Sequence, residues 1–252
     1  MILKYLNPLK YFLFIKRKIL ESRKNYRFFS YKKKLNKIEN VDELINLHFK
    51  FYSSFNHINY EMFKFLFSNF DNKPLKILET GSSAYGIKSS YLFLNYVDKF
   101  GGKFTTVDLN PDIRNEFFSY LNENIKFVVS DSVEYLSNMN KTDIGELDIV
   151  YLDSYDVDLN NPEPSENHGY NEFCSIEKYL KSGCLIAIDD TPKDYSMFSN
   201  LTESSTKIYQ ERRKKLGENY TPGKGAKIIL NLEIFNDFKI IYHEYSLVLQ
   251  KV

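Results

Sequence analysis

Five short apolar runs divide the chain from residue 74 onward, and helical stretches separate most of them. The runs span residues 76–78, 104–107, 125–129, 147–152 and 184–188. Strands that alternate with helices are typical of a parallel sheet. Two further runs, 238–243 and 245–250, are joined too tightly for a helical crossover, so we expect them to pair antiparallel. The pattern therefore predicts an α/β fold with a mostly parallel sheet and a C-terminal antiparallel hairpin.

The first 73 residues follow a different pattern. Asn40 is a helix-capping residue type, and apolar residues at helical spacing behind it predict a helix to about Tyr52. Residues 55–70 form a second, aromatic-rich helical stretch, whose apolar face we interpret as core. We expect three parts in the chain: a basic N-terminal extension (1–39), a helical lead-in (40–73) and one α/β domain (74–252). A chain of 252 residues is long enough for one large domain of this kind.

The net charge of +1 hides a strong asymmetry. Residues 1–40 carry 12 Lys or Arg against two Glu, a local charge of +10, which leaves −9 for the rest of the chain. The apolar run 11–15 is far shorter than the ~20 residues of a membrane span, and no small-residue cleavage site follows it. The basic segment is suited to an anionic membrane surface, or to packing on its own domain or on a second subunit.

The two cysteines, Cys174 and Cys184, provide no framework of disulfides. This usage indicates a reducing compartment. We therefore expect a cytoplasmic protein, with the inner face of the membrane as the place of any peripheral contact.

The turn after the first apolar run, within residues 76–90, has the features of a nucleotide-type cofactor pocket. Gly81 can adopt the positive φ of a tight strand-to-helix turn, and Gly86 lets the following helix pack close to the sheet. Ser83 stands where a dinucleotide fingerprint has the glycine that admits a pyrophosphate. Glu79, at the strand end, instead suits a ligand with a positive group and no phosphate, such as the methionine amine of S-adenosylmethionine.

An acidic residue follows each of the five runs, at once or one residue later. These acids are Glu79, Asp108, Asp131, Asp153, Asp189 and Asp190. In open α/β sheets, ligands bind outside the carboxyl ends of the strands, so these side chains should line one rim. The long polar pieces 156–168 and 191–222 are the segments that we expect to cover a site there.

Three motifs at these strand ends are Glu79-Thr-Gly-Ser-Ser-Ala-Tyr-Gly, Thr106-Val-Asp-Leu and Ser130-Asp-Ser. With the terminal hairpin, they resemble the class I S-adenosylmethionine-dependent methyltransferases, most of all the small-molecule O-methyltransferases of the sugar and catechol kind. The resemblance covers about 180 residues and implies a Rossmann-like methyltransferase fold. It implies cofactor contacts in the loop, at the ribose (Asp108) and beside the adenine (Asp131): Glu79, Gly81, Ser82, Ser83, Gly86, Asp108, Asp131 and Ser132. Asp108 and Asp131 are also suited to cap the helices that follow them.

The ends of the fourth and fifth runs, Tyr151-Leu-Asp-Ser-Tyr-Asp and Ile188-Asp-Asp-Thr, are similar to those that hold magnesium in metal-using members of the family. Adjacent strands lie ~4.8 Å apart, so Asp153, Asp189 and Asp190 can converge on one hard cation. Such an ion would lower the pKa of a bound acceptor hydroxyl. In the alternative, Asp153 binds the cofactor or the acceptor and Asp190 caps a helix.

His168 follows the first polar piece and precedes a predicted helix at 171–180, where a neutral imidazole can take the proton of the acceptor. Asp153 is the reserve candidate for this catalytic role, and a histidine at a helix start without any such role is the alternative. Gly223-Lys224-Gly225 can receive an anionic group, and the basic run 212–215 can meet one. A simple turn and a solvated helix face explain these two features equally well, so we leave both out of the predicted site.

We therefore expect an S-adenosylmethionine-dependent methyltransferase that acts on a hydroxyl of a small molecule, with a sugar or surface-glycan precursor as candidate acceptor and magnesium as candidate second cofactor. Nucleic acid is not an expected partner, whereas a homo-oligomer and an anionic membrane are candidates. A nicotinamide-dependent oxidoreductase is one alternative, disfavoured by Ser83 and by the terminal hairpin. A non-catalytic, membrane-associated module with the same fold is the other, suggested by the basic start of the chain.

Overall fold

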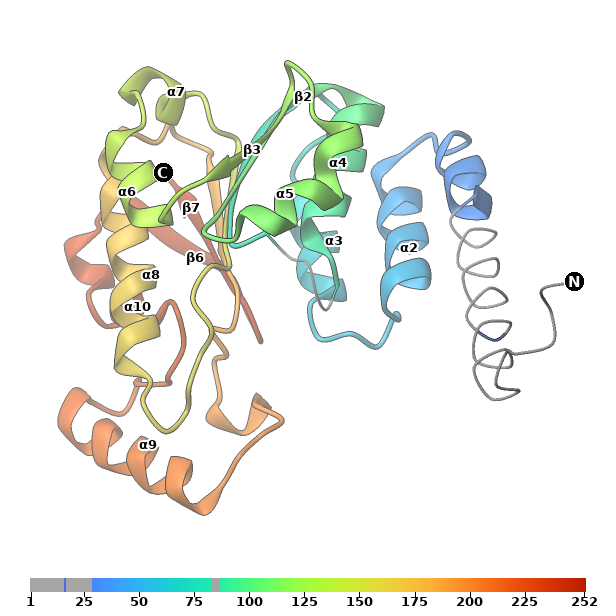
Figure 1. Cartoon of the computed structure of the whole chain (residues 1–252). Helices are drawn as coiled ribbons and strands as arrows, with labels where there is room; N and C mark the ends of the chain where they lie inside the picture. Colours follow the sequence, from blue (N-terminus) through green and yellow to red (C-terminus); the bar gives the residue numbers. More distant parts are fainter. Residues whose placement is uncertain (1–15, 17–28, 83–86) are drawn as a thin grey trace, which may run out of the picture.

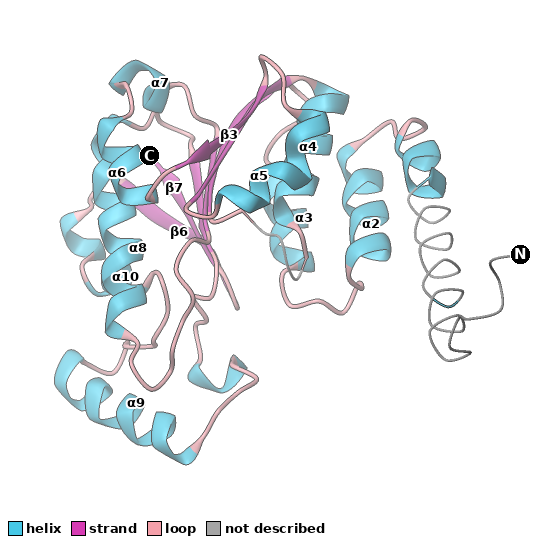
Figure 2. Ribbon diagram, viewed as in Figure 1, coloured by secondary structure: helices cyan, strands magenta, loops and turns pink. Residues whose placement is uncertain are grey.

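The computed structural model describes residue 16 and residues 29–82 and 87–252. Its centre is a seven-stranded sheet in the order β3-β2-β1-β4-β5-β7-β6 (Figure 1 and Figure 2). The strands are β1 (Leu75–Thr80), β2 (Gly102–Asp108), β3 (Ile125–Val129), β4 (Ile149–Leu152), β5 (Leu185–Ile188), β6 (Phe238–His243) and β7 (Leu247–Lys251). Strands β1 to β5 pair in parallel, and β7 pairs antiparallel with both β5 and β6. The predicted fold class is therefore confirmed.

Helices cover both faces of this sheet (Figure 1). One layer holds α2 (Val41–Tyr52), α3 (Tyr60–Ser68), α4 (Ser89–Phe100) and α5 (Pro111–Phe117), and the other holds α6 (Ser132–Asn138), α7 (Lys141–Gly145), α8 (Glu163–Ile176) and α10 (Ala226–Leu230). The side chains of strand β4 alternate between the two faces of the sheet and pack against both helical layers. Ile149 and Tyr151 join the first core, Val150 and Leu152 join the second, and all four are fully buried.

Further helical segments in the described part of the chain are residues 29–35, α9 (Glu203–Leu216) and the short 3-10 turns η2 (Phe118–Tyr120), η3 (Glu177–Tyr179), η4 (Tyr195–Met197) and η5 (Leu232–Ile234). Helix α9 lies in the second polar piece, at the foot of the molecule in Figure 1. No helix within the described ranges is long and apolar enough to cross a membrane.

The helical lead-in packs directly on the sheet. Asn40 caps α2 as predicted, since its side chain accepts a hydrogen bond from the backbone of Glu43 at 3.0 Å. The second helix begins at Tyr60, later than the aromatic pattern predicts. Tyr31 and Leu35, which belong to the predicted basic extension, are buried in the same core as the lead-in. The part of the extension that is described is thus tied to the domain.

The helix predicted at 171–180 begins earlier in the structure. Helix α8 begins at Glu163, so His168 lies within this helix and not before it. Proline at the helix start and two acidic residues in its first turn explain the earlier beginning, because both favour a helix N-terminus. Residues 226–234 form two short pieces, α10 and η5, with α10 starting after Gly225.

Candidate functional site

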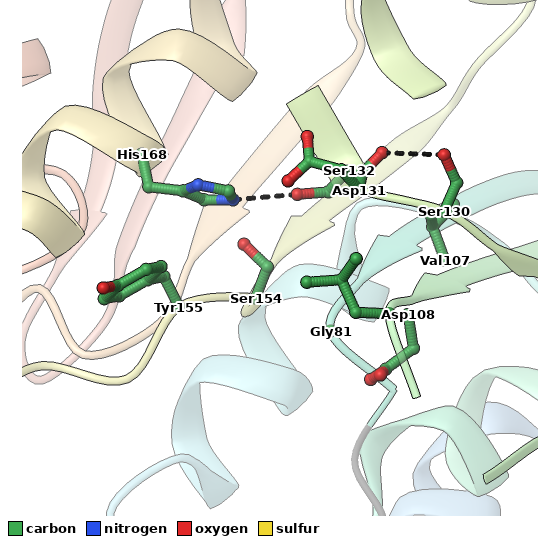
Figure 3. Close-up of a pocket in the computed structure, with 10 residues that line it drawn as sticks. Gly81, Val107, Asp108, Ser130, Asp131, Ser132, Ser154, Tyr155 and His168 are labelled. Atoms are coloured by element: carbon green, nitrogen blue, oxygen red, sulfur yellow. Dashed lines mark hydrogen bonds between the residues drawn. The ribbon is translucent and has the colours of Figure 1, made fainter. Parts of the chain in front are cut away.

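A cavity of about 140 Å³ opens at the carboxyl ends of the parallel strands β1 to β4 (Figure 3). Its wall consists of Gly81, Val107, Asp108, Leu109, Ser130, Asp131, Ser132, Ser154, Tyr155 and His168. The structure thus brings five of the predicted site residues to one cavity: Gly81, Asp108, Asp131, Ser132 and His168. Ser83 and Gly86, which are also predicted to contact the cofactor, lie outside the described residues.

Gly81 closes the turn between β1 and the cavity. Its φ of 77° lies in the left-handed region, and a Cβ atom here would lie 2.3 Å from the carbonyl oxygen of Asp153. The backbone N–H of Gly81 donates to Val107 at 2.8 Å, and that of Asp153 donates to Thr80 at 2.9 Å. The turn is therefore held between the ends of β2 and β4, and only glycine fits it.

Asp108 ends β2 and fastens the same turn from the other side. Its carboxylate accepts hydrogen bonds from the backbone of Ser82 and of Asn110, each at 2.8 Å. Asn110, and not Asp108, caps helix α5, since the Asn110 side chain accepts from the backbone of Asp112. The half-buried Asp108 therefore lines the cavity and does not cap a helix. Contact with a ribose stays a prediction.

Glu79 is fully buried and is not among the residues that line the cavity. Its carboxylate accepts hydrogen bonds from Ser89 at 2.6 Å, from Ser90, and from Thr106 at 2.7 Å. Burial raises the pKa of Glu79 to about 7, against the opposing effect of these hydroxyl donors. Thr106 in turn shares a hydrogen bond of 2.7 Å with Ser82. In this structure Glu79 stabilises the turn after β1 and the start of α4.

Asp131, Ser132 and His168 form the opposite wall of the cavity (Figure 3). Asp131 caps α6 by accepting from the backbone of Glu134 at 2.9 Å, so the capping alternative is correct for this residue, which also borders the cavity. The His168 ring lies 2.9 Å from the Ser132 hydroxyl and 3.6 Å from the carboxylate of Glu172. The nearby carboxylate of Glu172 raises the pKa of His168.

The acids at the ends of β4 and β5 meet a lysine. The ammonium of Lys224 lies 2.5 Å from Oδ1 of Asp153 and 3.2 Å from Oδ2 of Asp190. Burial would lower the pKa of Lys224, but the carboxylates of Asp153, Asp190 and Asp189 outweigh burial and raise it, so this side chain stays protonated. Asp190 also accepts a hydrogen bond from Tyr245 at 2.8 Å.

Asp189, the third predicted metal ligand, points into the protein. One of its carboxylate oxygens accepts from Asn59 at 2.9 Å and from Ser246 at 2.7 Å, and the other accepts from Asn59 at 3.1 Å and from Tyr151 at 2.9 Å. A carboxylate has about four acceptor positions, so this one is saturated.

The residues at these strand ends do not fit a metal ion as they are arranged. Magnesium prefers oxygen ligands that point at one centre. Here Asp153 and Asp190 point at an ammonium, and Asp189 accepts four hydrogen bonds from three side chains. In the part of the chain that the structure describes, no group of three His, Cys, Asp or Glu residues is placed to hold a metal.

No family model matches the sequence, and no curated protein matches it. Solved structures share its architecture. The MycE methyltransferase of the mycinamycin biosynthetic pathway, in complex with Mg, SAH and mycinamycin VI, has a TM-score of 0.56 at 14% identity, over 84% of this chain and 54% of that one. The SAH-bound Podospora anserina methyltransferase PaMTH1 has a TM-score of 0.52 at 12% identity, over 92% and 96%.

This chain has the fold of the S-adenosylmethionine-dependent methyltransferases. The resemblance that the motifs indicate is thereby confirmed at the level of the fold. The chain spans about half the length of MycE, whereas it spans nearly all of PaMTH1.

Sequence reasoning missed two residues of this methyltransferase-fold site. Glu172 lies one helical turn after His168, a spacing that would have paired them, but the predicted helix began only at residue 171. Lys224 belongs to a short motif that a turn explains equally well. No local signal places its ammonium between two strand ends, because that contact joins residues 71 positions apart.

Proposed function

We propose that this chain transfers a methyl group from S-adenosylmethionine to a hydroxyl of a small acceptor, with a sugar or surface-glycan precursor as the candidate. The observation that carries the proposal is the cavity at the carboxyl ends of β1 to β4, which gathers Gly81, Asp108 and Asp131 from three consecutive strand ends. Ligands of open α/β sheets bind at this edge. The acceptor is proposed to be small because the strand-end motifs resemble those of small-molecule O-methyltransferases.

Each wall of the cavity has a place in cofactor binding under this proposal. Asp108 would accept hydrogen bonds from the ribose hydroxyls, and Asp131 with Ser132 would border the adenine. Gly81 and Ser82 would approach the methionine part with their backbone, for which the turn has no obstructing side chain at Gly81. Glu79 would act indirectly by holding this turn.

S-adenosylmethionine, when bound, supplies the electrophilic methyl group. The protein must then orient the acceptor oxygen and remove its proton. His168 is the proposed base, since its ring borders the cavity and Glu172 favours its protonated form. Asp153 is the reserve candidate. Magnesium has no part in the proposal, because Lys224 already pairs with Asp153 and Asp190.

The basic N-terminal segment is proposed to bring the enzyme to an anionic membrane from the cytoplasmic side. Most of that segment, including its apolar residues before position 16, lies outside the described residues. A homo-oligomer is the alternative use of the same segment, and no nucleic-acid partner is proposed.

Calorimetric titration of the full chain with S-adenosylmethionine and, separately, with NAD tests the proposal. Saturable binding of S-adenosylmethionine and no heat with NAD are the expected results. Binding of NAD alone would replace the proposal by the oxidoreductase alternative. A screen of activated sugars and lipid-linked glycans for methyl transfer then distinguishes an enzyme from a non-catalytic module, because only the enzyme consumes the cofactor.

A further inference from the structure

Lys224 is built into the fold by close backbone contacts. A Cβ atom at Gly223 would lie 2.3 Å from the carbonyl oxygen of Asp190, and one at Gly225 would lie 2.7 Å from the Thr191 side chain. The backbone N–H of Gly225 also donates to Oγ1 of Thr191 at 2.9 Å. The two glycines therefore let the chain on either side of Lys224 lie against the segment that follows β5.

Helix α8 presses on the same lysine from the other side. A Cβ atom at Gly169 would lie 2.3 Å from the carbonyl oxygen of Lys224. The lysine backbone is thus held between α8 and the end of β5, and its side chain is 4% exposed. A lysine is rarely buried to this degree unless its charge is paired. Here the paired charges are those of Asp153 and Asp190.

Those two carboxylates keep some contact with solvent, with exposed fractions of 21% for Asp153 and 28% for Asp190. Asp153 is followed directly by Ser154 and Tyr155, which line the cavity. The ion-paired group consequently adjoins the end of the cavity where β4 terminates. In the described part of the chain, the ionic partners of the Lys224 ammonium are these two carboxylates, so its charge is directed at the ends of β4 and β5.

We propose that Lys224 is a resident cation that takes the place of a divalent metal ion at the acceptor end of this site. The inference rests on the proposed function, because that function makes this cavity the acceptor site. The pairing of Lys224 with the two carboxylates does not depend on a bound cofactor. Lys224 offsets the negative charge of Asp153 and Asp190 and holds both carboxylates in place. It is a positioning residue for the two aspartates, and the reaction proceeds without a metal.

The test uses Mn²⁺ alone as the probe, titrated calorimetrically into the full chain and into Lys224→Ala. The wild-type chain should show no saturable binding up to about 1 mM, the range of weak protein sites for divalent cations. Lys224→Ala should bind Mn²⁺ at least about tenfold more tightly than that limit, because loss of the ammonium leaves two adjacent carboxylates unneutralised. Lys227→Ala is the matched control, since Lys227 lies on the same segment and contacts Asn167. It should bind no Mn²⁺.

Two outcomes overturn the inference: saturable Mn²⁺ binding by the wild type that Asp153→Asn abolishes, or no Mn²⁺ binding by a folded Lys224→Ala chain. Thermal unfolding checks that each variant folds, and Lys224→Gln, which keeps a polar stem, replaces Lys224→Ala if that variant does not. S-adenosylmethionine binding is measured on the same wild-type sample. Absence of S-adenosylmethionine binding would count against the proposed function, whereas the Mn²⁺ titrations decide the role of Lys224.

Discussion

The carboxylate of Asp108 connects the turn after β1 to the cavity. It accepts from the backbone of Ser82 and of Asn110 and borders the cavity. Asp108→Ala is expected to weaken S-adenosylmethionine binding, because each hydrogen bond to a charged group contributes ~1.5–3 kcal/mol. That loss corresponds to a roughly ten- to hundredfold higher Kd. Calorimetric titration measures it.

Asp112→Ala is the matched control for this prediction. Asp112 is an exposed carboxylate in the first turn of α5, only four positions further along the chain. The control should bind the cofactor with the wild-type affinity. Equal affinities for both variants and the wild type would remove Asp108 from the cofactor site.

Glu79 makes folding stability depend on pH near neutrality. Its pKa of about 7 in the folded chain lies above the ordinary value of 4.5, so between these pH values the folded state holds a proton that the unfolded state has released. Stability contributed by the protonated group is therefore lost as the pH rises from 4.5 to 7, by about 3 kcal/mol in total. Glu79→Gln cannot ionise and should lack this loss.

Urea unfolding of the chain without cofactor, at pH 5 and pH 7.5, measures the effect. The free energy of unfolding of Glu79→Gln, relative to the wild type, should increase with pH. The comparison cancels other titrating groups such as His48, whose pKa burial lowers to about 4. A pH-independent difference between the two proteins would show that Glu79 is ionised throughout this range.

At the scale of elements, the position of α8 depends on one glycine. Replacing a helical glycine by alanine ordinarily stabilises a helix by about 1 kcal/mol. At Gly169 the new Cβ atom would lie 2.3 Å from the backbone carbonyl of Lys224, which has little freedom to move. Gly169→Ala is therefore expected to lower the free energy of unfolding, with the clash reversing the sign of the helix-propensity effect. Denaturant unfolding monitors it.

Asn171→Ala, on the exposed side of the same helix, provides the comparison. Helix propensity predicts a neutral or slightly stabilising effect there. Stabilisation by both alanines would mean that α8 does not press against the lysine segment.

The sequence predicts the strands of the sheet well but not the start of helix α8. The core strands β1 to β5 were located because each is a buried apolar run followed by an acid. The start of α8 was missed because a polar, proline-containing stretch there favours both a loop and a helix N-terminus. The basic run in α9 was interpreted as a solvated face, yet Arg212 pairs with the buried Glu166 and with Tyr220, a long-range contact that α9 uses to reach α8.

At the scale of the whole molecule, we expect the basic N-terminal segment to be dispensable for cofactor binding. Residues 1–28 carry eight Lys or Arg against one Glu. A chain that lacks these residues should keep its affinity for S-adenosylmethionine but sediment less with anionic vesicles, because each basic residue near such a surface contributes about 1 kcal/mol. The deletion stops before Tyr31 and Leu35, since both are buried in the core.

Neutral vesicles supply the control for this deletion, because the electrostatic attraction requires anionic lipid. Neither chain should sediment with them. Equal sedimentation of both chains with anionic vesicles would favour a role of the segment in packing or in a homo-oligomer.

The sequence by itself determined the strands of the parallel part, the terminal hairpin and the edge of the sheet at which the cavity opens. These properties follow from local information: apolar runs report burial, loop lengths limit strand pairing, and strand ends locate the acids. The tertiary structure alone decided what each acid does. Glu79 meets three hydroxyls, Asp189 is saturated by residues from α3's N-terminal side, β4 and the β6–β7 turn, and Asp153 pairs with Lys224. The partner that sets the charge of a carboxylate approaches through space from a distant part of the chain, and a pattern of neighbouring residues does not contain it.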